Sequence, residues 1–232
     1  MKHTSFLNGL SALLASTAVS LLIAPTVMAQ DNTGWYGEIS ILSADAKDAE
    51  FNSTGRNTRT QFDKDAGYSA ALGYKFAPNA VGQLRVETEF VSTSNDVDSV
   101  TFNGNNFSGG AVGGGVDTKS LFINAKYAFD VGSDTFSPFI GAGIGYSKVD
   151  SSINYNNGRA SINDDDTALS YQLLVGTDVN INKNWQGFAQ YRYSKTDDLN
   201  LTRFGGPAPA SATNQSGDFS YNAISVGLRY EY

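Results

Sequence analysis

Eight segments of the chain alternate apolar and polar residues with a period of two, which is the spacing of side chains along a β-strand. They occupy residues 34–42, 66–76, 82–90, 120–129, 136–147, 168–181, 185–194 and 221–232. No stretch of helical periodicity lies among them. The pattern therefore predicts an all-β chain with eight antiparallel strands joined in an up-and-down order.

The connections between these segments alternate in length. Three are short, at residues 77–79, 130–135 and 182–184. Four are long and polar, at approximately residues 43–65, 94–117, 150–166 and 196–218. In an up-and-down sheet the short turns gather at one end and the long loops at the other. With eight strands, both chain termini fall at the short-turn end.

The first 29 residues have the features of a secretory signal. Lys2 supplies the positive charge, residues 10–24 carry only apolar and small hydroxyl side chains, and residues 27–29 supply small residues for cleavage. The apolar run is short for a helix that spans a membrane, which needs about 20 residues. We predict a signal peptide over 1–29, cleaved after Ala29, and one β-barrel domain over 30–232; the alternative is an uncleaved anchor.

Composition excludes several classes of function. Loss of Lys2 with the leader leaves 15 of the 16 basic residues against 23 acidic ones, a net charge of −8. That charge argues against a nucleic-acid partner, which requires a basic surface. The chain has no cysteine, so disulfides do not hold this exported domain together. Its one histidine, His3, lies in the leader.

The polar faces of the strands carry charges in mid-strand, which helps to decide which face is inside. A soluble barrel has its apolar face inside, whereas a membrane barrel turns that face to lipid. The charges are balanced, five basic and five acidic, and unpaired charges inside a narrow barrel would each cost several kcal/mol. We therefore expect an interior charge network of Glu38, Lys75, Arg85, Glu87, Glu89, Lys126, Asp178, Arg192, Arg229 and Glu231.

Aromatic residues cluster at both ends of the apolar face. At the short-turn end we expect an aromatic girdle of Trp35, Phe76, Phe129, Phe136 and Trp185. At the long-loop end the same face carries Tyr68, Phe90, Tyr146, Tyr171 and Tyr193. Ordinary strand propensity also favours aromatics, but it does not explain their clustering at the two ends. The two rings and the unequal loops predict an eight-stranded antiparallel transmembrane β-barrel in a bacterial outer membrane.

The last strand carries a motif that resembles the C-terminal signal of bacterial outer-membrane proteins: Ser225, Gly227, Tyr230 and Tyr232, in the order polar, any, glycine, any, any, aromatic, any, aromatic. Residues 137–147, SPFIGAGIGYS, resemble the fifth strand of the outer-membrane β-barrel domain family, which includes OmpA-like, OmpX-like and opacity-like barrels of eight strands. The resemblance covers the whole mature chain. It implies that the barrel-assembly machinery reads the last strand. OmpA-like proteins often carry a second, peptidoglycan-binding domain, and we expect no such domain here.

The residues give little support for an enzyme. Histidine suits acid–base catalysis near neutral pH, and the mature chain has none. Glu87 and Glu89 are paired carboxylates, but the interior network explains them without catalysis. Residues 163–167, NDDDT, could hold calcium, although they lack the spacing and turn glycine of a calcium loop. We expect no catalytic site, no cofactor and no bound metal.

An eight-stranded barrel is only wide enough for its interior side chains. We therefore expect a structural or surface-interaction protein, an adhesin or an envelope-integrity barrel, that acts through its four long loops. The alternative is a narrow, porin-like channel for ions or small solutes, suggested by three glycines predicted to face the lumen, Gly141, Gly143 and Gly145. The expected partners are outer-membrane lipid and lipopolysaccharide, the barrel-assembly machinery, and a host or matrix ligand at the loops.

Overall fold

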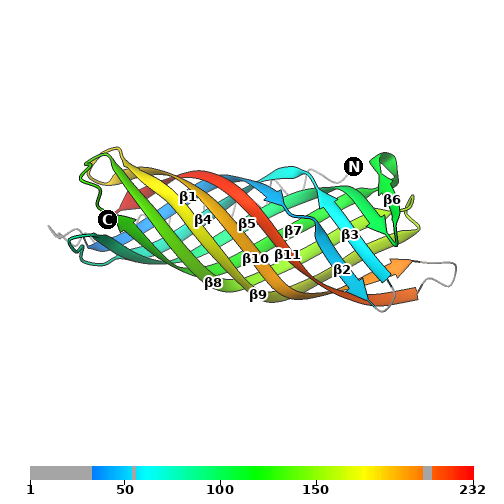
Figure 1. Ribbon diagram of the computed structural model, residues 1–232. Coiled ribbons are helices and arrows are strands. Elements are labelled where there is room, and N and C mark those ends of the chain that lie inside the picture. Colours follow the sequence, from blue (N-terminus) through cyan, green and yellow to red (C-terminus); the bar gives the residue numbers. More distant parts are fainter. Residues whose placement is uncertain (1–32, 54–55, 206–210) are drawn as a thin grey trace.

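The chain forms one antiparallel sheet that closes into a long barrel (Figure 1). The computed structural model describes residues 33–53, 56–205 and 211–232, so the predicted leader lies outside the described residues. The ring consists of β1 (Gly34–Ala46), β4 (Lys64–Lys75), β5 (Gly82–Phe102), β7 (Gly113–Phe129), β8 (Phe136–Tyr155), β9 (Ala160–Asn180), β10 (Trp185–Gly205) and β11 (Ser211–Glu231). Pairing of β1 with β11 closes it. This confirms the predicted eight-stranded, antiparallel up-and-down barrel.

Three short elements complete the wall. Strand β2 (Ala49–Ser53) pairs with β11, and β3 (Arg56–Phe62) pairs with β2 and β5. They therefore form the wall between β11 and β5 in the part of the barrel that lies beyond the ends of β1 and β4. Strand β6 (Asn105–Ser108) folds back on β5 and leads into a single 3-10 turn. Within the described ranges, no helix is long and apolar enough to cross a membrane.

The three short connections lie at one end of the barrel, which we call the turn end; the opposite end is the distal end. Each of these turns contains an Asn or Asp whose side-chain oxygen accepts backbone N–H groups of the turn: Asn79, Asp130 and Asn182. Strand β1 begins and the last strand ends here too, because the backbone N–H of Tyr232 donates to the carbonyl of Trp35. The grouping of the short turns, with the start of the first strand and the end of the last beside them, agrees with the predicted arrangement of the strands.

Toward the turn end, apolar side chains point outward and polar ones inward. Ile39 is 55% exposed, whereas its neighbour Glu38 is 4% exposed. The strands were predicted correctly in this half because the alternation is strict there. The exposed apolar belt includes Ile41, Leu72, Leu84, Val86, Leu121, Ile123, Ile140, Ile144, Leu173, Val175, Val226 and Leu228.

The prediction of four long loops is wrong, because most of residues 43–65, 94–117, 150–166 and 196–218 belong to strands. In this distal half the alternation continues with the faces exchanged. On β8, Val149 and Ile153 are buried inside the barrel, whereas Lys148 and Asp150 are exposed outside. Polar outward residues gave these segments the composition of loops, but their inward apolar residues make them strands with an internal core.

Candidate functional site: the barrel lumen

The part of the lumen nearer the turn end is filled by charged side chains. All ten residues of the predicted charge network point inward, from β1, β4, β5, β7, β9, β10 and β11. Nine of them are buried, and the tenth, Glu231, is half-buried at the turn end. Strands that are far apart in the sequence therefore deliver their charges to one volume inside the barrel.

One cluster of ion pairs is centred on Arg229 and Lys126. Arg229 contacts Glu38 at 2.6 Å and Asp178 at 3.0 Å. Lys126 lies 3.1 Å from Glu38 and 2.7 Å from Glu87, so these two cations share one carboxylate. The cluster ties β1, β5, β7, β9 and β11 together across the lumen.

Three further pairs complete the network. Arg85 contacts Asp178 at 2.7 Å. Arg192 pairs with Glu89, on the opposite side of the ring, and Lys75 pairs with Glu231 next to the opening at the turn end. Each of the ten predicted residues therefore has at least one partner of opposite charge. Such pairing offsets the large cost of taking charges out of water.

Neutral side chains satisfy the remaining oxygens of the buried carboxylates. The hydroxyl of Tyr36 donates to Glu87 at 2.8 Å, and the amide of Asn124 donates to both Glu87 and Glu89. The amide of Gln172 also donates to Glu89, at 3.0 Å. Sequence reasoning did not single out these three neutral residues, although the alternation places them on the same inward face.

The paired carboxylates of Glu87 and Glu89 therefore contact cations and amides rather than open space. Each is 2% exposed, and both their oxygens accept hydrogen bonds or ion pairs from inward side chains. In this arrangement neither carboxylate is free for acid–base chemistry on a substrate.

A layer of hydroxyl groups follows toward the distal end. Ser40 and Ser69 share a hydrogen bond of 2.8 Å between β1 and β4. On the other side of the ring, hydroxyls form a chain from β7 to β10 with links of 2.6 to 2.7 Å. Its members are Ser120, Ser147, Ser170 and Thr196.

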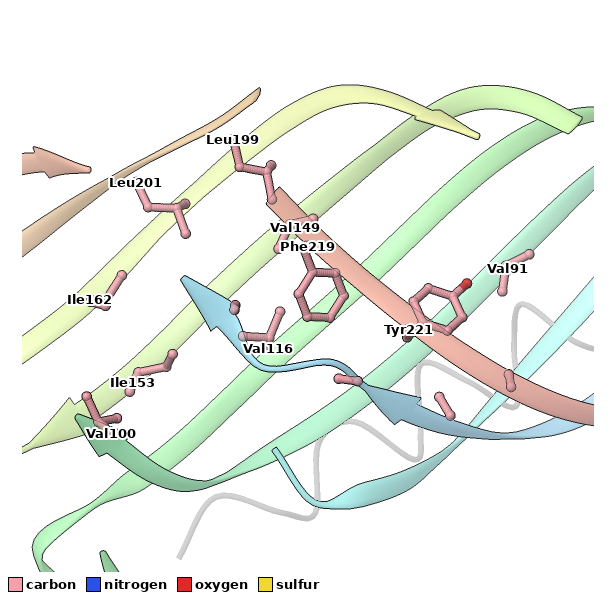
Figure 2. Close-up of a cluster of buried hydrophobic side chains, with 14 of the residues drawn as sticks. Val91, Val100, Val116, Val149, Ile153, Ile162, Leu199, Leu201, Phe219 and Tyr221 are labelled. Atoms are coloured by element: carbon pink, nitrogen blue, oxygen red, sulfur yellow. The ribbon is translucent and has the colours of Figure 1, made fainter. Parts of the chain in front are cut away.

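Apolar side chains fill the lumen in the distal half (Figure 2). Phe219 and Tyr221 of β11 point inward among branched aliphatic residues of the other strands, and Phe62 packs edge-on against Phe219 at 5.8 Å. This apolar plug consists of Leu42, Ala44, Ala46, Ala49, Val91, Val100, Val116, Phe122, Val149, Ile153, Tyr155, Ala160, Ile162, Leu199, Leu201, Phe219, Tyr221 and Ala223. It was not predicted from the sequence.

Glycines on the inward face allow bulky neighbours to pack closely. A Cβ added to Gly143 would lie 1.9 Å from the amide oxygen of Asn124, and one added to Gly73 would lie 2.3 Å from the ring of Tyr36. The space above Gly143 is therefore occupied by a side chain of the network. This packing argues against an open channel at Gly143, one of the three glycines that suggested a channel.

The predicted girdle residues lie on the outer surface at the turn end. Trp35, Phe76, Phe136 and Trp185 are between 42% and 56% exposed, and Phe129 is half-buried. Edge-on aromatic contacts join several of them to neighbouring tyrosines, with centroid separations of 4.9 to 5.4 Å. The second set, Tyr68, Phe90, Tyr146, Tyr171 and Tyr193, also faces outward, nearer the middle of the barrel.

The C-terminal motif lies in the strand that closes the barrel. Ser225 and Gly227 face inward, and the ring of Phe188 fills the space where a side chain at position 227 would lie. Tyr230 and Tyr232 face outward and contact each other edge-on at 5.1 Å. Recognition of this motif by assembly machinery stays a prediction.

The acidic stretch at 163–167 spans a gap in the wall between β9 and β10. The backbone pairing stops between Thr196 and Arg203, and side chains of β9 replace it. The carboxylate of Asp166 accepts the backbone N–H of Asn200 at 2.8 Å, and that of Asp164 accepts the N–H of Thr202 at 2.8 Å. Hydrogen bonds from Thr202 lower the pKa of Asp164 below its usual value.

These contacts give the acidic stretch a structural role. In the described part of the chain, no group of three or more His, Cys, Asp or Glu side chains is arranged to hold a metal ion. The carboxylates that were considered as calcium ligands instead substitute for backbone acceptors.

Comparisons with solved structures support the fold. The outer membrane protein OprG from Pseudomonas aeruginosa matches with a TM-score of 0.58 and 15% identity, covering 86% of this chain and 96% of that one. The outer membrane protease OmpT from Escherichia coli matches with a TM-score of 0.52 and 10% identity, over 90% and 99% of the two chains. A major outer membrane protein from Thermus thermophilus gives 0.52 and 10%, over 84% and 99%.

A search of curated proteins found no match. The solved structures share the fold with this chain, and at these identities they say nothing of its chemistry. The sequence profile of the outer membrane protein beta-barrel domain matches residues 12–231, nearly the full length. The chain therefore belongs to the outer membrane protein beta-barrel domain family.

Proposed function

We propose that this protein is a non-conducting outer-membrane barrel whose distal wall is a surface for interaction outside the cell. The observation that carries the proposal is the filled lumen. Ion pairs, hydroxyls and apolar side chains follow one another from the turn end to the distal end. A solute moving along the axis would have to break buried ion pairs and then displace a packed apolar core.

The orientation follows from the connections. In outer-membrane barrels the short turns face the periplasm and the longer connections face the exterior. We therefore place the distal end outside the cell. Its strands hold the outward side chains on a rigid sheet, so a partner would meet a fixed pattern of charges instead of mobile loops.

The distal wall carries ion pairs on its outer surface. Arg59 contacts Asp48 at 2.5 Å, and Lys64 contacts Asp45 at 3.2 Å. Exposed pairs of this kind add little stability, typically below about 1 kcal/mol. Their value in this proposal is a surface of defined charge that a matrix or host ligand could recognise.

Single-channel conductance of the refolded mature protein in a planar bilayer tests the closed lumen. Heat-modifiable mobility in gels controls for folding. We expect a folded, silent barrel. A discrete conductance that changes with Arg192→Gln or Glu89→Gln would show that ions pass through the lumen and would refute the proposal.

The interaction surface needs its own test. Strand β6 and its turns, residues 103–112, can be replaced by a short linker, because pairing of β5 with β7 begins only at Asp96 and Gly115. We expect the shortened barrel to fold and to lose attachment to host cells or matrix proteins. Unchanged attachment and unchanged envelope-stress phenotypes would argue against an interaction role for this tip.

A narrow channel is the second candidate, and one observation favours it. The hydroxyl oxygens of Thr93, Thr118 and Ser151 are buried and have no hydrogen-bonding partner in the described protein. Buried polar groups of this kind commonly bind water. The conductance experiment separates the two candidates, because water that is trapped inside the barrel gives no current.

Two further expectations belong to this proposal. Cleavage after Ala29 predicts a mature chain that starts at Gln30, which mass spectrometry of the purified protein would show. Recognition of the last strand by the assembly machinery predicts that Tyr230→Ser with Tyr232→Ser lowers the amount of folded barrel in the outer membrane without abolishing refolding in vitro.

A further inference from the structure

The outer surface of β7, β8 and β9 is arranged in rows that cross all three strands. The first row is apolar: Leu121 pairs with Tyr146, and Tyr146 pairs with Leu169. These three side chains are between 48% and 63% exposed, and they end the apolar belt on this side of the barrel. In a membrane they would contact the outer part of the acyl chains.

The next row toward the distal end is basic. Lys119 of β7 lies directly opposite Lys148 of β8, and Thr167 of β9 is next in the row. All three side chains are exposed. Directly opposed residues have Cβ atoms about 5 Å apart, and like charges in such pairs are destabilising.

The two lysines differ in the partners they have. Lys148 lies 3.0 Å from Asp165. Lys119 makes no ion pair within the part of the chain that the structure describes. The surface therefore presents two ammonium groups side by side: Lys148 has a carboxylate partner, and Lys119 has no ion pair among the described residues.

The third row is acidic: Asp117 pairs with Asp150, and Asp150 pairs with Asp165. It lies one row beyond the lysines. An anion attracted by the lysines is repelled from this row, so its depth is fixed at the end of the apolar belt. The surface thus matches an amphiphile whose acyl chains end in an anionic group.

We propose that Lys119 and Lys148 bind a phosphate group of a phosphorylated lipid in the outer leaflet, whose acyl chains lie along Leu121, Tyr146 and Leu169. The two lysines are directly opposed, with Cβ atoms about 5 Å apart, so their ammonium groups can donate to different oxygens of one phosphate. Such charge-assisted hydrogen bonds are stronger than those between neutral groups. Lys119, which has no ion pair in the described chain, then gains a counter-charge, and Lys148 shares its charge between Asp165 and the phosphate. This inference does not depend on whether the lumen conducts.

Native mass spectrometry of the full mature protein in a nonionic detergent tests the site, with diphosphoryl lipid A as the probe. We expect Lys119→Gln with Lys148→Gln to weaken binding roughly tenfold, as the loss of two exposed charge contacts implies. The matched control is Lys47→Gln with Lys64→Gln, which removes the same charge on the other side of β5. It should leave binding within about twofold.

Three results would overturn the proposal. The first is an equal loss of binding in both double variants, which would mean general charge attraction. The second is equally tight binding of lipid A without phosphates. The third is displacement of lipid A by millimolar inorganic phosphate, which would identify a site for free phosphate. Heat-modifiable mobility confirms that each variant is folded before binding is compared.

Discussion

Lys126→Met tests whether the buried ion pairs hold the barrel closed. The side chain is fully buried, with its ammonium group 2.7 Å from Glu87 and 3.1 Å from Glu38. Methionine replaces the aliphatic stem and removes only the charge and its hydrogen bonds. Glu38 keeps Arg229 as a partner, whereas Glu87 loses its one ion pair among the described residues.

The expected cost follows from the uncompensated carboxylate. Removing one partner of a buried ion pair typically destabilises a protein by about 3 to 5 kcal/mol. With a urea slope of about 2 kcal/mol per M, the unfolding midpoint would fall by roughly 2 M. The assay is urea unfolding of the barrel refolded in lipid vesicles, followed by the fluorescence of Trp35 and Trp185, the only tryptophans in the chain.

A second variant separates lost charge pairing from lost packing. Lys126→Met combined with Glu87→Gln removes both charges and keeps an oxygen for the hydroxyl of Tyr36. We expect this double variant to be more stable than Lys126→Met alone. The reasoning is refuted if the single variant lies within about 1 kcal/mol of the wild type, or if the second substitution destabilises it further.

Three other perturbations have expected outcomes in the same unfolding assay or by hydrogen exchange. Phe219→Ala, in the apolar plug, should cost about 3 to 5 kcal/mol, and a value below about 1 would mean that the plug is loosely packed. Gly143→Ala should cost about 1 to 3 kcal/mol because its methyl group would overlap a neighbouring amide, whereas Gly110→Ala, which meets nothing within 4 Å, should be nearly neutral. The folded-state pKa of Asp164 is lowered, so the contribution of its carboxylate to stability is present above about pH 4 and is lost as the pH falls through that lowered pKa. Hydrogen exchange of the Thr202 amide, which donates to this carboxylate, should therefore accelerate in acid. Asp164→Asn should remove this pH dependence.

The half of the barrel near the turn end could be predicted from the sequence because one physical rule applies throughout it. Lipid outside and a polar lumen inside force each strand to alternate, as Ile39 and Glu38 do. The short turns were also predictable, since residues such as Asn79 and Asp130 have side chains that bond to turn backbone. The rule was therefore enough to predict the number of strands in the ring and the end of the barrel at which the first strand begins and the last strand ends.

The distal half was predicted wrongly because the rule reverses there. Water replaces lipid outside, so the outward residues become polar, and the lumen becomes apolar. In β8, the apolar residues move from even positions, such as Ile144, to odd ones, and Val149 and Ile153 point inward next to exposed polar neighbours such as Asp150. Because such a segment has no outward apolar face, it was interpreted as a loop. A change of phase in the alternation, rather than its loss, was the signal that would have identified these strands.

The sequence predicted which residues form the charge network, but it did not predict which of them form ion pairs with one another. Inward residues follow from strand phase, which is a local property of each segment. Partners such as Arg229 and Asp178 come from strands that do not adjoin in the ring, so their contact depends on barrel shear and side-chain length. The neutral partners Asn124 and Gln172 carry no charge that would mark them in a sequence.

The exchange of faces along the strands also sets how far the molecule stands out from the cell. Strand β10 has 21 residues, which at about 3.3 Å each and a tilt of about 40° gives a height of roughly 50 Å. The apolar band of an outer-membrane barrel is about 25 Å tall. With the orientation proposed above, about half of the barrel therefore stands beyond the lipid as a hydrogen-bonded wall. Proteases cut most readily at exposed loop tips, so a secreted protease would find few accessible bonds between the bilayer and the outermost turns.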